Sequence, residues 1–284
     1  MIRQITILGT GTMGRGIAYL AAVAGYDTVL FDADAGALDA AKAGIDSILR
    51  KGVEKGKLAQ GDADAASARL QIVPELEPAV SGADLILEAV PESYELKTDL
   101  FAQVDLYCGV DTILASNTSS ISITKLASNV ERRERFIGMH FFNPPHVMKL
   151  IEIVRGERTD DRTVNQVREI AEKMGKTPIV VRDSPGFATS RLGVAIGLEA
   201  IRMLEEGVGS AEDIDRAMEL GYNHPMGPLR LTDLVGLDVR LGIAEYLAST
   251  LGPRFEPPQL LRDLVAQGKL GKKTGQGFYA WPNE

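Results

Sequence analysis

The residues best suited to chemistry lie in one short stretch, residues 138–152, with the sequence GMHFFNPPHVMKLIE. An apolar run is broken by Pro144 and Pro145 and then resumes, which predicts two strands with His140 near the end of the first and Glu152 in the second. Histidine changes charge near neutral pH, and a neighbouring carboxylate would fix its tautomer and stabilise the imidazolium. The pair could therefore act as a general base with an orienting acid. From the residues alone, a satisfied polar pair in the core is the alternative.

A second set of informative residues follows the first predicted strand. Residues 2–8 read as a buried strand, and GTGTMG at residues 9–14 leads into a helix pattern. The next strand, residues 28–31, ends at Asp32, which would repel a 2′-phosphate and so favours NAD over NADP. Glycines permit close approach of the backbone to a pyrophosphate, and the acid can accept from the adenosine ribose. The predicted cofactor-binding residues are Gly9, Gly11, Thr12, Met13, Gly14 and Asp32.

Strand and helix patterns alternate through the first part of the chain. A long helix is predicted over residues 36–58. Alternation of this kind predicts an α/β fold with a Rossmann-like, doubly wound, mainly parallel sheet. We therefore expect an NAD-binding domain over residues 1–184. Further strands are predicted at residues 84–88, 112–115, 136–142, 150–154 and 178–181.

Beyond residue 184 the pattern becomes almost wholly helical, which predicts a smaller all-helical domain over residues 185–284. Ser210 and Asp213 have the spacing of a helix N-cap, and the helix that they begin should end at Gly221. A small apolar helical domain commonly packs on a copy of itself, so a homodimer formed through this domain is expected. The other predicted helices are residues 187–206, 229–237, 239–250 and 259–267.

Composition excludes several classes of function. The net charge of -8 argues against a nucleic-acid partner. No apolar run could cross a bilayer and no signal-peptide cleavage site follows the N-terminus, so we expect a cytoplasmic protein with no membrane partner. The single cysteine, Cys108, should be a small buried hydrophobe. With one cysteine and three histidines, no metal site is predicted.

Five separated motifs together carry a resemblance to a known family. They resemble the 3-hydroxyacyl-CoA dehydrogenase family, most of all its short, single-function 3-hydroxybutyryl-CoA dehydrogenases, and they extend over essentially the whole chain. The resemblance implies reversible hydride transfer between NAD and the C3 hydroxyl of an (S)-3-hydroxyacyl-CoA, with short acyl chains expected. The motifs are ASNTSS at 115–120, HFFNP at 140–144, VMKL at 147–150 with Glu152, PMGP at 225–228, and GKKTG at 271–275 followed by GFY at 277–279.

The resemblance also assigns roles to individual residues. It implies that His140 is the general base, that Glu152 orients it, and that Ser119 hydrogen-bonds the reacting oxygen. At Ser190 the family typically has asparagine near the catalytic histidine, so a catalytic role for this shorter side chain is doubtful. The residues implied to contact NAD are Glu92, Lys97, Ser119, Asn143 and Lys273. Taken alone, charged residues such as Glu92, Lys97 and Lys273 are more often solvated surface residues.

A basic cluster suggests where coenzyme A would bind. Arg50, Lys51, Lys55 and Lys57 lie close together in an otherwise acidic chain, and Lys51 and Lys55 share a helix face. The family uses lysines at these places for the CoA moiety, so an acyl-CoA substrate bound by Lys51, Lys55 and Ser119 is implied. A solvated charged face is the alternative.

Two other functions stay open at this point. The first is a dehydrogenase of the same fold that acts on a free 3-hydroxy acid, of the gulonate or carnitine type; the lysine cluster argues against it. The second is a non-catalytic NAD-binding protein, as some lens crystallins are. The presence of Ser119, His140 and Glu152 together argues against that function, because a structural role would not require all three.

Overall fold

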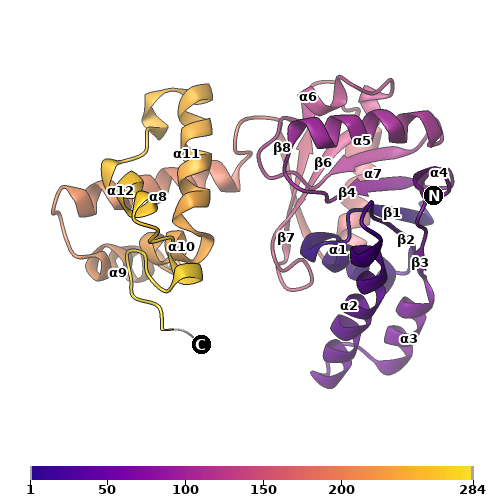
Figure 1. Cartoon of the computed structure of the whole chain (residues 1–284), viewed down its shortest axis with the longest axis horizontal. Coiled ribbons are helices and arrows are strands. Elements are labelled where there is room, and N and C mark those ends of the chain that lie inside the picture. The colour runs from indigo at the N-terminus through magenta and orange to yellow at the C-terminus, as the bar shows by residue number, and fades with distance from the viewer. Residues whose placement is uncertain (1, 283–284) are drawn as a thin grey trace. The chain divides into compact units, whose positions relative to one another are not determined.

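The structure, a computed structural model that describes residues 2–282, separates into two units, Met1–Ser184 and Pro185–Glu284 (Figure 1). The first unit contains a single sheet of eight strands covered by helices, whereas the second is built from helices. The expected α/β class with a helical second domain is confirmed. No helix within residues 2–282 is both long enough and apolar enough to span a membrane.

The eight strands follow the order β3-β2-β1-β4-β5-β6-β7-β8. Every neighbouring pair is parallel except β6 and β7, so the sheet is mainly parallel, as predicted. The central strands are continuous apolar runs because both of their faces are covered. The strands are β1 (Gln4–Leu8), β2 (Asp27–Phe31), β3 (Leu70–Ile72), β4 (Leu85–Glu88), β5 (Ile113–Ser116), β6 (Phe136–Phe141), β7 (Leu150–Arg155) and β8 (Thr177–Arg182).

Helices cover both faces of this sheet. On one face, α1, α2, α3 and α7 share a core with alternate strand residues such as Ile137 and Met139. The side chain of Phe136, one position before Ile137 in β6, points to the other face of the sheet. There its ring meets that of Phe101 of α5 edge to face, at 4.6 Å between ring centroids. The helices of this unit are α1 (Thr12–Val23), α2 (Ala35–Glu54), α3 (Gln60–Ala68), α4 (Leu76–Val80), α5 (Tyr94–Tyr107), α6 (Ile123–Ala127), the short 3₁₀ helix η1 (Arg133–Arg135) and α7 (Asp161–Lys173).

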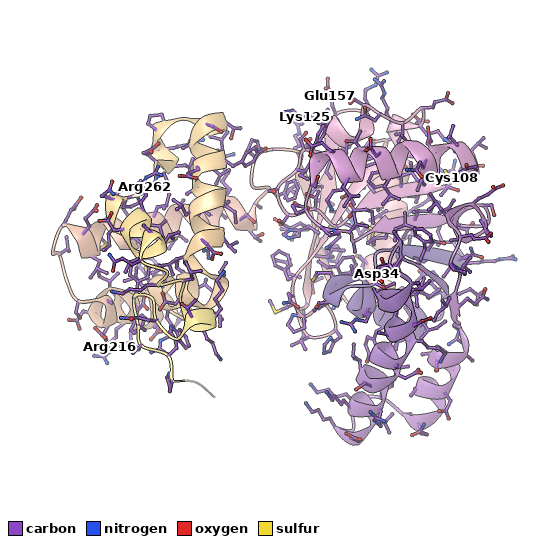
Figure 2. The ribbon with its side chains drawn as sticks, viewed as in Figure 1. Asp34, Cys108, Lys125, Glu157, Arg216 and Arg262 are labelled. Atoms are coloured by element: carbon purple, nitrogen blue, oxygen red, sulfur yellow. The ribbon has the colours of Figure 1, made fainter. Side chains whose placement is uncertain are left out.

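Helix α2 begins at a side-chain cap and ends earlier than predicted. Asp34 (Figure 2) accepts a hydrogen bond from the backbone N–H of Gly36 at 2.8 Å. At the other end, Gly56 adopts a positive φ of 64°, and the N–H groups of Gly56 and Lys57 bond back to the carbonyls of Val53 and Gly52. These two hydrogen bonds form a Schellman motif, which ends the helix at Glu54. The sequence pattern had predicted an end at residue 58.

The second unit contains the predicted helices within a few residues. Ser210 accepts from the N–H of Asp213 at 3.1 Å, which confirms the predicted cap of α9. That helix continues to Tyr222, beyond the predicted stop at Gly221, because Asn223 supplies the left-handed C-terminal residue. The elements are α8 (Thr189–Glu205), α9 (Ala211–Tyr222), α10 (Pro228–Val235), α11 (Leu237–Leu251), α12 (Gln259–Ala266) and the 3₁₀ helices η2 (Pro253–Phe255) and η3 (Lys272–Thr274).

A buried carboxylate fastens the C-terminal segment to α10. Asp233 is fully buried and accepts from the N–H groups of Phe278 and Tyr279, both at 2.9 Å, and from Nε1 of Trp281 at 2.8 Å. A Cβ at Gly277 would lie 2.2 Å from the same carboxylate, so only glycine fits there. The GFY motif is thus explained by packing around one acid.

A second buried acid explains the PMGP motif in the same way. Asp215 accepts from the N–H groups of Leu229 and Arg230 at 2.7 and 2.9 Å, and from the Tyr279 hydroxyl at 2.8 Å. A Cβ at Gly227 would lie 2.2 Å from the Asp215 side chain. Asp215 therefore caps the start of α10 across the chain, where no residue of that helix supplies its own side-chain cap.

Replacing Asp233 by asparagine should destabilise the second unit by about 1–3 kcal/mol, because the amide offers only one acceptor oxygen to three buried donors. Trp281 is the only tryptophan in the chain and donates to Asp233, so its fluorescence during urea unfolding reports on this site directly. Asp263→Asn, at an exposed bond to Gln259, is the matched control and should change stability by less than about 0.5 kcal/mol. Equal unfolding midpoints for the two variants would contradict the prediction.

Candidate active site

The carboxyl ends of the parallel strands form the edge at which the candidate site lies. The chain leaves β1 toward β2 on one side, and β4 lies on the other side of β1, so the strand order reverses between β1 and β4. In open α/β sheets, ligands bind at this reversal, outside the carboxyl ends of the strands. A cavity of about 330 Å³ lies there and is lined by Met13, Ala89, Val90, Glu92, Lys97, Asn117, Ser119, His140, Phe141, Phe142 and Asn143.

The glycine loop after β1 has the geometry that a pyrophosphate needs. Gly9 has a φ of 95°, and a Cβ there would lie 2.8 Å from the backbone of Ala89. A Cβ at Gly14 would lie 1.8 Å from the Gly9 carbonyl oxygen. Gly11, in contrast, faces open space at the N-terminus of α1, and no side chain caps that helix. Gly9 and Gly14 are thus required because no side chain fits at either position, and Gly11 leaves room for an anion at the N-terminus of α1.

Asp32 stands at the end of β2 as a rigid carboxylate. Its Oδ2 accepts from the N–H and hydroxyl of Thr10 at 2.7 and 2.9 Å, and its Oδ1 accepts from the N–H of Asp34 at 3.0 Å. Partial burial works to raise the pKa of Asp32, but these hydrogen bonds outweigh it and hold the pKa below its usual value. The group is ionised at neutral pH and keeps lone pairs for ribose hydroxyls. The glycine loop and Asp32 together fit a dinucleotide.

The pairing of β6 with β7 brings His140 and Glu152 together. The two residues are directly opposite each other in this antiparallel pair, and Nδ1 of His140 lies 2.8 Å from Oε2 of Glu152. Glu152 is completely buried, and His140 is nearly so. Because a carboxylate can only accept, Nδ1 carries the proton of the neutral imidazole. The structure therefore contains the predicted pair with one tautomer selected.

Glu92 organises the turn that carries Ser119. Its Oε1 accepts from the Thr118 hydroxyl at 2.5 Å and from the N–H groups of Ser119 and Ser120 at 3.0 and 3.2 Å. Burial works to raise the pKa of Glu92, but the Lys97 ammonium and then the Thr118 hydroxyl hold it below its usual value. Glu92 is consequently a carboxylate that fixes the position of the Ser119 backbone.

Lys97 is buried, with only 1% of its side chain exposed, whereas a solvated lysine would lie on the surface. Its Nζ lies 2.6 Å from Oε1 of Glu88 and 3.2 Å from Oε2 of Glu92. Glu88 was not among the residues predicted from the sequence. It ends the apolar strand β4 and also accepts from the Ser116 hydroxyl at 2.6 Å. The sequence did contain one indication of a role for Glu88: it is an acid at the carboxyl end of a buried strand, where ligands bind in this class of fold.

Asn117 was also missed, although it lies within a recognised motif. Its Oδ1 accepts from the N–H of Phe141 at 2.9 Å, which ties the end of β5 to the end of β6 beside His140. Asn143, which was predicted, lines the cavity just before Pro144. Among the residues described, no group of histidine, cysteine and acidic side chains is arranged to hold a metal ion.

Two of the predicted site residues belong to the second unit. Lys273 lies in η3, and its Nζ is 2.6 Å from both carboxylate oxygens of Asp238. Ser190 lies in the first turn of α8. The structure thus pairs Lys273 with an acid that sequence reasoning had not considered.

The basic cluster predicted for CoA lies at the C-terminal end of α2. Lys51 is in the last turn, Lys55 is the C-cap residue, and both are exposed. His146, in the loop between β6 and β7, has a pKa below its usual value, first because of burial and then because of Lys176, Lys57 and Lys55. The cluster and the loop that follows His140 are therefore neighbours.

Comparison with known proteins agrees with this geometry. Residues 4–184 match the family model described as 3-hydroxyacyl-CoA dehydrogenase, NAD binding domain, and residues 186–281 match its C-terminal domain. The 3-hydroxybutyryl-CoA dehydrogenase of Clostridioides difficile is 41% identical over 97% of this chain and 98% of its own. The mitochondrial hydroxyacyl-coenzyme A dehydrogenase of Sus scrofa is 40% identical over 99% of this chain and 92% of its own.

One of the solved structures is similar to this chain over its whole length. The crystal structure of (S)-3-hydroxybutyryl-CoA dehydrogenase PaaH1 from Ralstonia eutropha has a TM-score of 0.96 and 43% identity, with both chains fully covered. The matches to both family models agree with the strand order, the glycine loop and the acid–histidine pair of the structure. The chain belongs to the 3-hydroxyacyl-CoA dehydrogenase family and is an oxidoreductase that uses NAD.

Proposed function

We propose that the protein oxidises the C3 hydroxyl of short-chain (S)-3-hydroxyacyl-CoA, 3-hydroxybutyryl-CoA above all, with His140 as the general base. The observation that carries this proposal is the buried His140–Glu152 pair at the end of β6, in a cavity that also contains Ser119. The short acyl chain is supported by the relatives from Clostridioides difficile and Ralstonia eutropha, which are named for 3-hydroxybutyryl-CoA.

The proposed reaction removes two hydrogens from the substrate: the protein takes the hydroxyl hydrogen as a proton, and the cofactor takes the C3 hydrogen as a hydride. His140 takes the hydroxyl proton at Nε2, because Nδ1 is hydrogen-bonded to Glu152. Glu152 stabilises the imidazolium that forms, and Ser119 Oγ hydrogen-bonds the C3 oxygen as it becomes a carbonyl. NAD, when bound, accepts the C3 hydrogen with its electron pair. The products are 3-ketoacyl-CoA, NADH and a proton held by His140.

The cofactor is assigned to the edge between β1 and β4. The pyrophosphate is placed at Gly11, Thr12 and the N-terminus of α1, and Asp32 accepts from the adenosine ribose. The nicotinamide is placed in the cavity. The residues assigned to that end are Met13, Glu92, Lys97, Ser119 and Asn143.

The second unit contributes two further assignments. Lys273 is assigned to the cofactor, and its pairing with Asp238 means that it would act as a neutralised ion pair. Ser190 is assigned a minor part near the substrate, because one short hydroxyl replaces the amide of the family asparagine. Neither assignment is needed for the acid–base chemistry at His140.

The lysines at the end of α2 are assigned to the CoA phosphates. Lys51 and Lys55 are exposed, and Lys55 and Lys57 lie near His146 in the loop after the catalytic strand. A polyanion held there would bring its acyl arm toward the end of β6. A free 3-hydroxy acid carries no such polyanion, so this cluster favours the thioester over the gulonate or carnitine type of substrate.

Replacing His140 by glutamine should lower turnover roughly a thousandfold or more, because proton transfer and the charge that supports it are lost together. Turnover is measured as NADH oxidation with 3-ketoacyl-CoA of increasing chain length, and the wild-type rate should be highest for the four-carbon acyl group. NADH binding, followed by fluorescence, should persist in the variant.

The matched variant for this test is Glu152→Gln, which retains an acceptor for Nδ1 but removes the charge. It should lose about a hundredfold and show an altered pH dependence of turnover, because an amide cannot stabilise imidazolium as a carboxylate does. Near-normal turnover in a folded His140→Gln protein would refute the proposed chemistry.

The double replacement Lys51→Ala and Lys55→Ala should weaken thioester binding, seen as a rise in KM of roughly tenfold at low salt. The loss should shrink as salt is added, because screening already removes part of the attraction. KM for NADH should change less than about twofold. Arg3→Ala, also a basic residue of the first unit, is the control and should leave both values unchanged. Loss of NADH binding instead of thioester binding would show that the ligands are misplaced.

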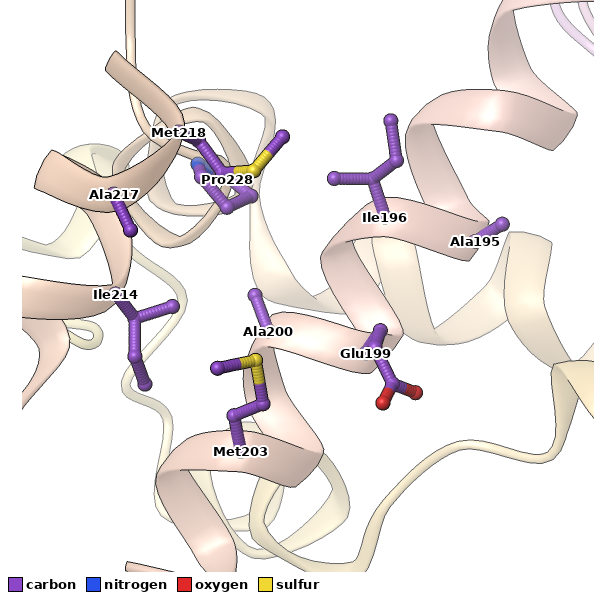
Figure 3. Close-up of a pocket in the computed structure, with 9 residues that line it drawn as sticks. All are labelled: Ala195, Ile196, Glu199, Ala200, Met203, Ile214, Ala217, Met218 and Pro228. Carbon is purple, nitrogen blue, oxygen red and sulfur yellow. The ribbon is translucent and has the colours of Figure 1, made fainter. Parts of the chain in front are cut away.

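We further propose that the second unit forms a homodimer through the apolar surface of α8 and α9. A cavity of about 360 Å³ there is lined by Ala195, Ile196, Glu199, Ala200, Met203, Ile214, Ala217, Met218 and Pro228. In Figure 3 the side chains of Met203, Met218 and Ile214 surround the hollow, and Glu199 is the only charged member of the set. An apolar hollow of this kind suits the apolar side chains of a second copy.

Placing an acid in this hollow should separate the copies. Ile196→Asp should convert a dimer into a monomer in sedimentation velocity at micromolar concentration, because the aspartate would be buried without a partner in the dimer. Leu106→Asp, at an exposed apolar residue of α5, is the control and should leave the mass unchanged. A wild-type protein that sediments as a monomer, or an Ile196→Asp protein that stays dimeric, would exclude this interface.

A further inference from the structure

A row of three charged side chains runs from the interior of the sheet to the candidate site. Glu88 is completely buried, and its Oε1 lies 2.6 Å from Nζ of Lys97. The same ammonium lies 3.2 Å from Oε2 of Glu92. Two carboxylates thus share one ammonium, and the row carries one net negative charge.

The contact with the Lys97 ammonium favours the ionised form of Glu88. Burial raises the pKa of Glu88 above its usual value, although the Lys97 ammonium, and after it the Ser116 hydroxyl and the Val90 N–H, lower it in part. A fully buried ammonium requires a counter-charge at contact distance, which Glu88 supplies. The Lys97 ammonium and the Val90 N–H both donate to Oε1, and the Ser116 hydroxyl can donate to Oε2, so every contact of Glu88 accommodates a carboxylate.

The excess charge is presented to the cavity. Glu88 lies behind the ammonium, so it compensates Lys97 from the interior side. Glu92 and Lys97 line the cavity together with Ser119 and His140. Because Lys97 is already neutralised by Glu88, the negative charge of Glu92 is left to act on whatever occupies the cavity.

We propose that Glu88, acting through Lys97, makes the site discriminate between the two oxidation states of the cofactor. The nicotinamide ring of NAD⁺ is cationic and that of NADH is neutral, so an uncompensated Glu92 carboxylate stabilises the oxidised form relative to the reduced form. Glu88 is a positioning residue in this scheme, because it is completely buried behind Lys97 and does not line the cavity. The inference rests on the proposed placement of the nicotinamide beside Ser119 and His140.

The decisive variant is Glu88→Gln, which keeps the shape of the side chain and removes its charge. Lys97 then neutralises Glu92 and the row has no net charge. The dissociation constants of NAD⁺ and NADH are measured separately, by calorimetry and by nicotinamide fluorescence. Kd for NAD⁺ should rise roughly tenfold while Kd for NADH changes less than about twofold, as expected for one charge acting over several ångströms in a partly hydrated site.

Two further variants separate charge from architecture. Ser116→Ala removes a hydrogen bond to Glu88 but keeps all three charges, so it should lower the melting temperature and leave the ratio of the two Kd values unchanged. Glu92→Gln removes the same net charge without changing the buried Glu88–Lys97 pair. It should change the ratio in the same direction as Glu88→Gln, and it keeps the test decisive if Glu88→Gln does not fold.

The outcomes are distinct. An unchanged ratio in a folded Glu92→Gln protein, or the same ratio in Glu88→Gln and Ser116→Ala, would overturn the inference. Failure of the proposed function would look different, since the wild-type protein would then not oxidise NADH with any 3-ketoacyl-CoA. The Kd ratio is measured without an acyl-CoA and does not depend on that result.

Discussion

The candidate site depends on one reversal in an otherwise mainly parallel sheet. Strand β7 pairs antiparallel with β6, which sets Glu152 directly across from His140. Opposite residues of an antiparallel pair have their side chains on the same face and within contact distance, so backbone register alone brings acid and base together. The register is held at Gly138, where a Cβ would lie 2.7 Å from Cβ of Val154. A slip of one residue would turn Glu152 to the opposite face of the sheet.

The charges gathered at this edge suit a reaction in which charge moves but does not accumulate. In the proposed oxidation the nicotinamide loses its positive charge as His140 gains one, so the net charge of the cavity is the same before and after the step. In the proposed arrangement Glu152 faces the charge that appears, and Glu92, which lines the cavity, faces the one that disappears. Both carboxylates are held by hydrogen bonds formed before any ligand arrives, which keeps reorganisation small.

The sequence predicted the layers of the fold, because alternating strands and helices and a glycine loop are local patterns. The family resemblance named several of the residues that line the cavity, among them Ser119 and His140. The sequence did not predict β3, a strand of three residues in which only Leu70 is buried. It also missed Glu88 and the burial of Lys97, since a charged residue in a helix normally indicates solvent. Their pairing arises when β4, the loop after it and α5 fold against one another. Nothing in the spacing of charges along the chain distinguishes such a pair from a surface one.

The motifs that carry the family resemblance are of two physical kinds. Those around Ser119 and His140 place polar groups in a cavity, so the proposed chemistry accounts for them. Those of the second unit surround two buried carboxylates, where Gly227 and Gly277 leave no room for a side chain and the donors come from main chain, tyrosine and tryptophan. Losing either acid would leave several buried donors unsatisfied, a cost large enough to account for these motifs without any contact to substrate. A recurring sequence pattern therefore marks a position that tolerates little change, and the contacts around it decide whether packing or catalysis is the reason.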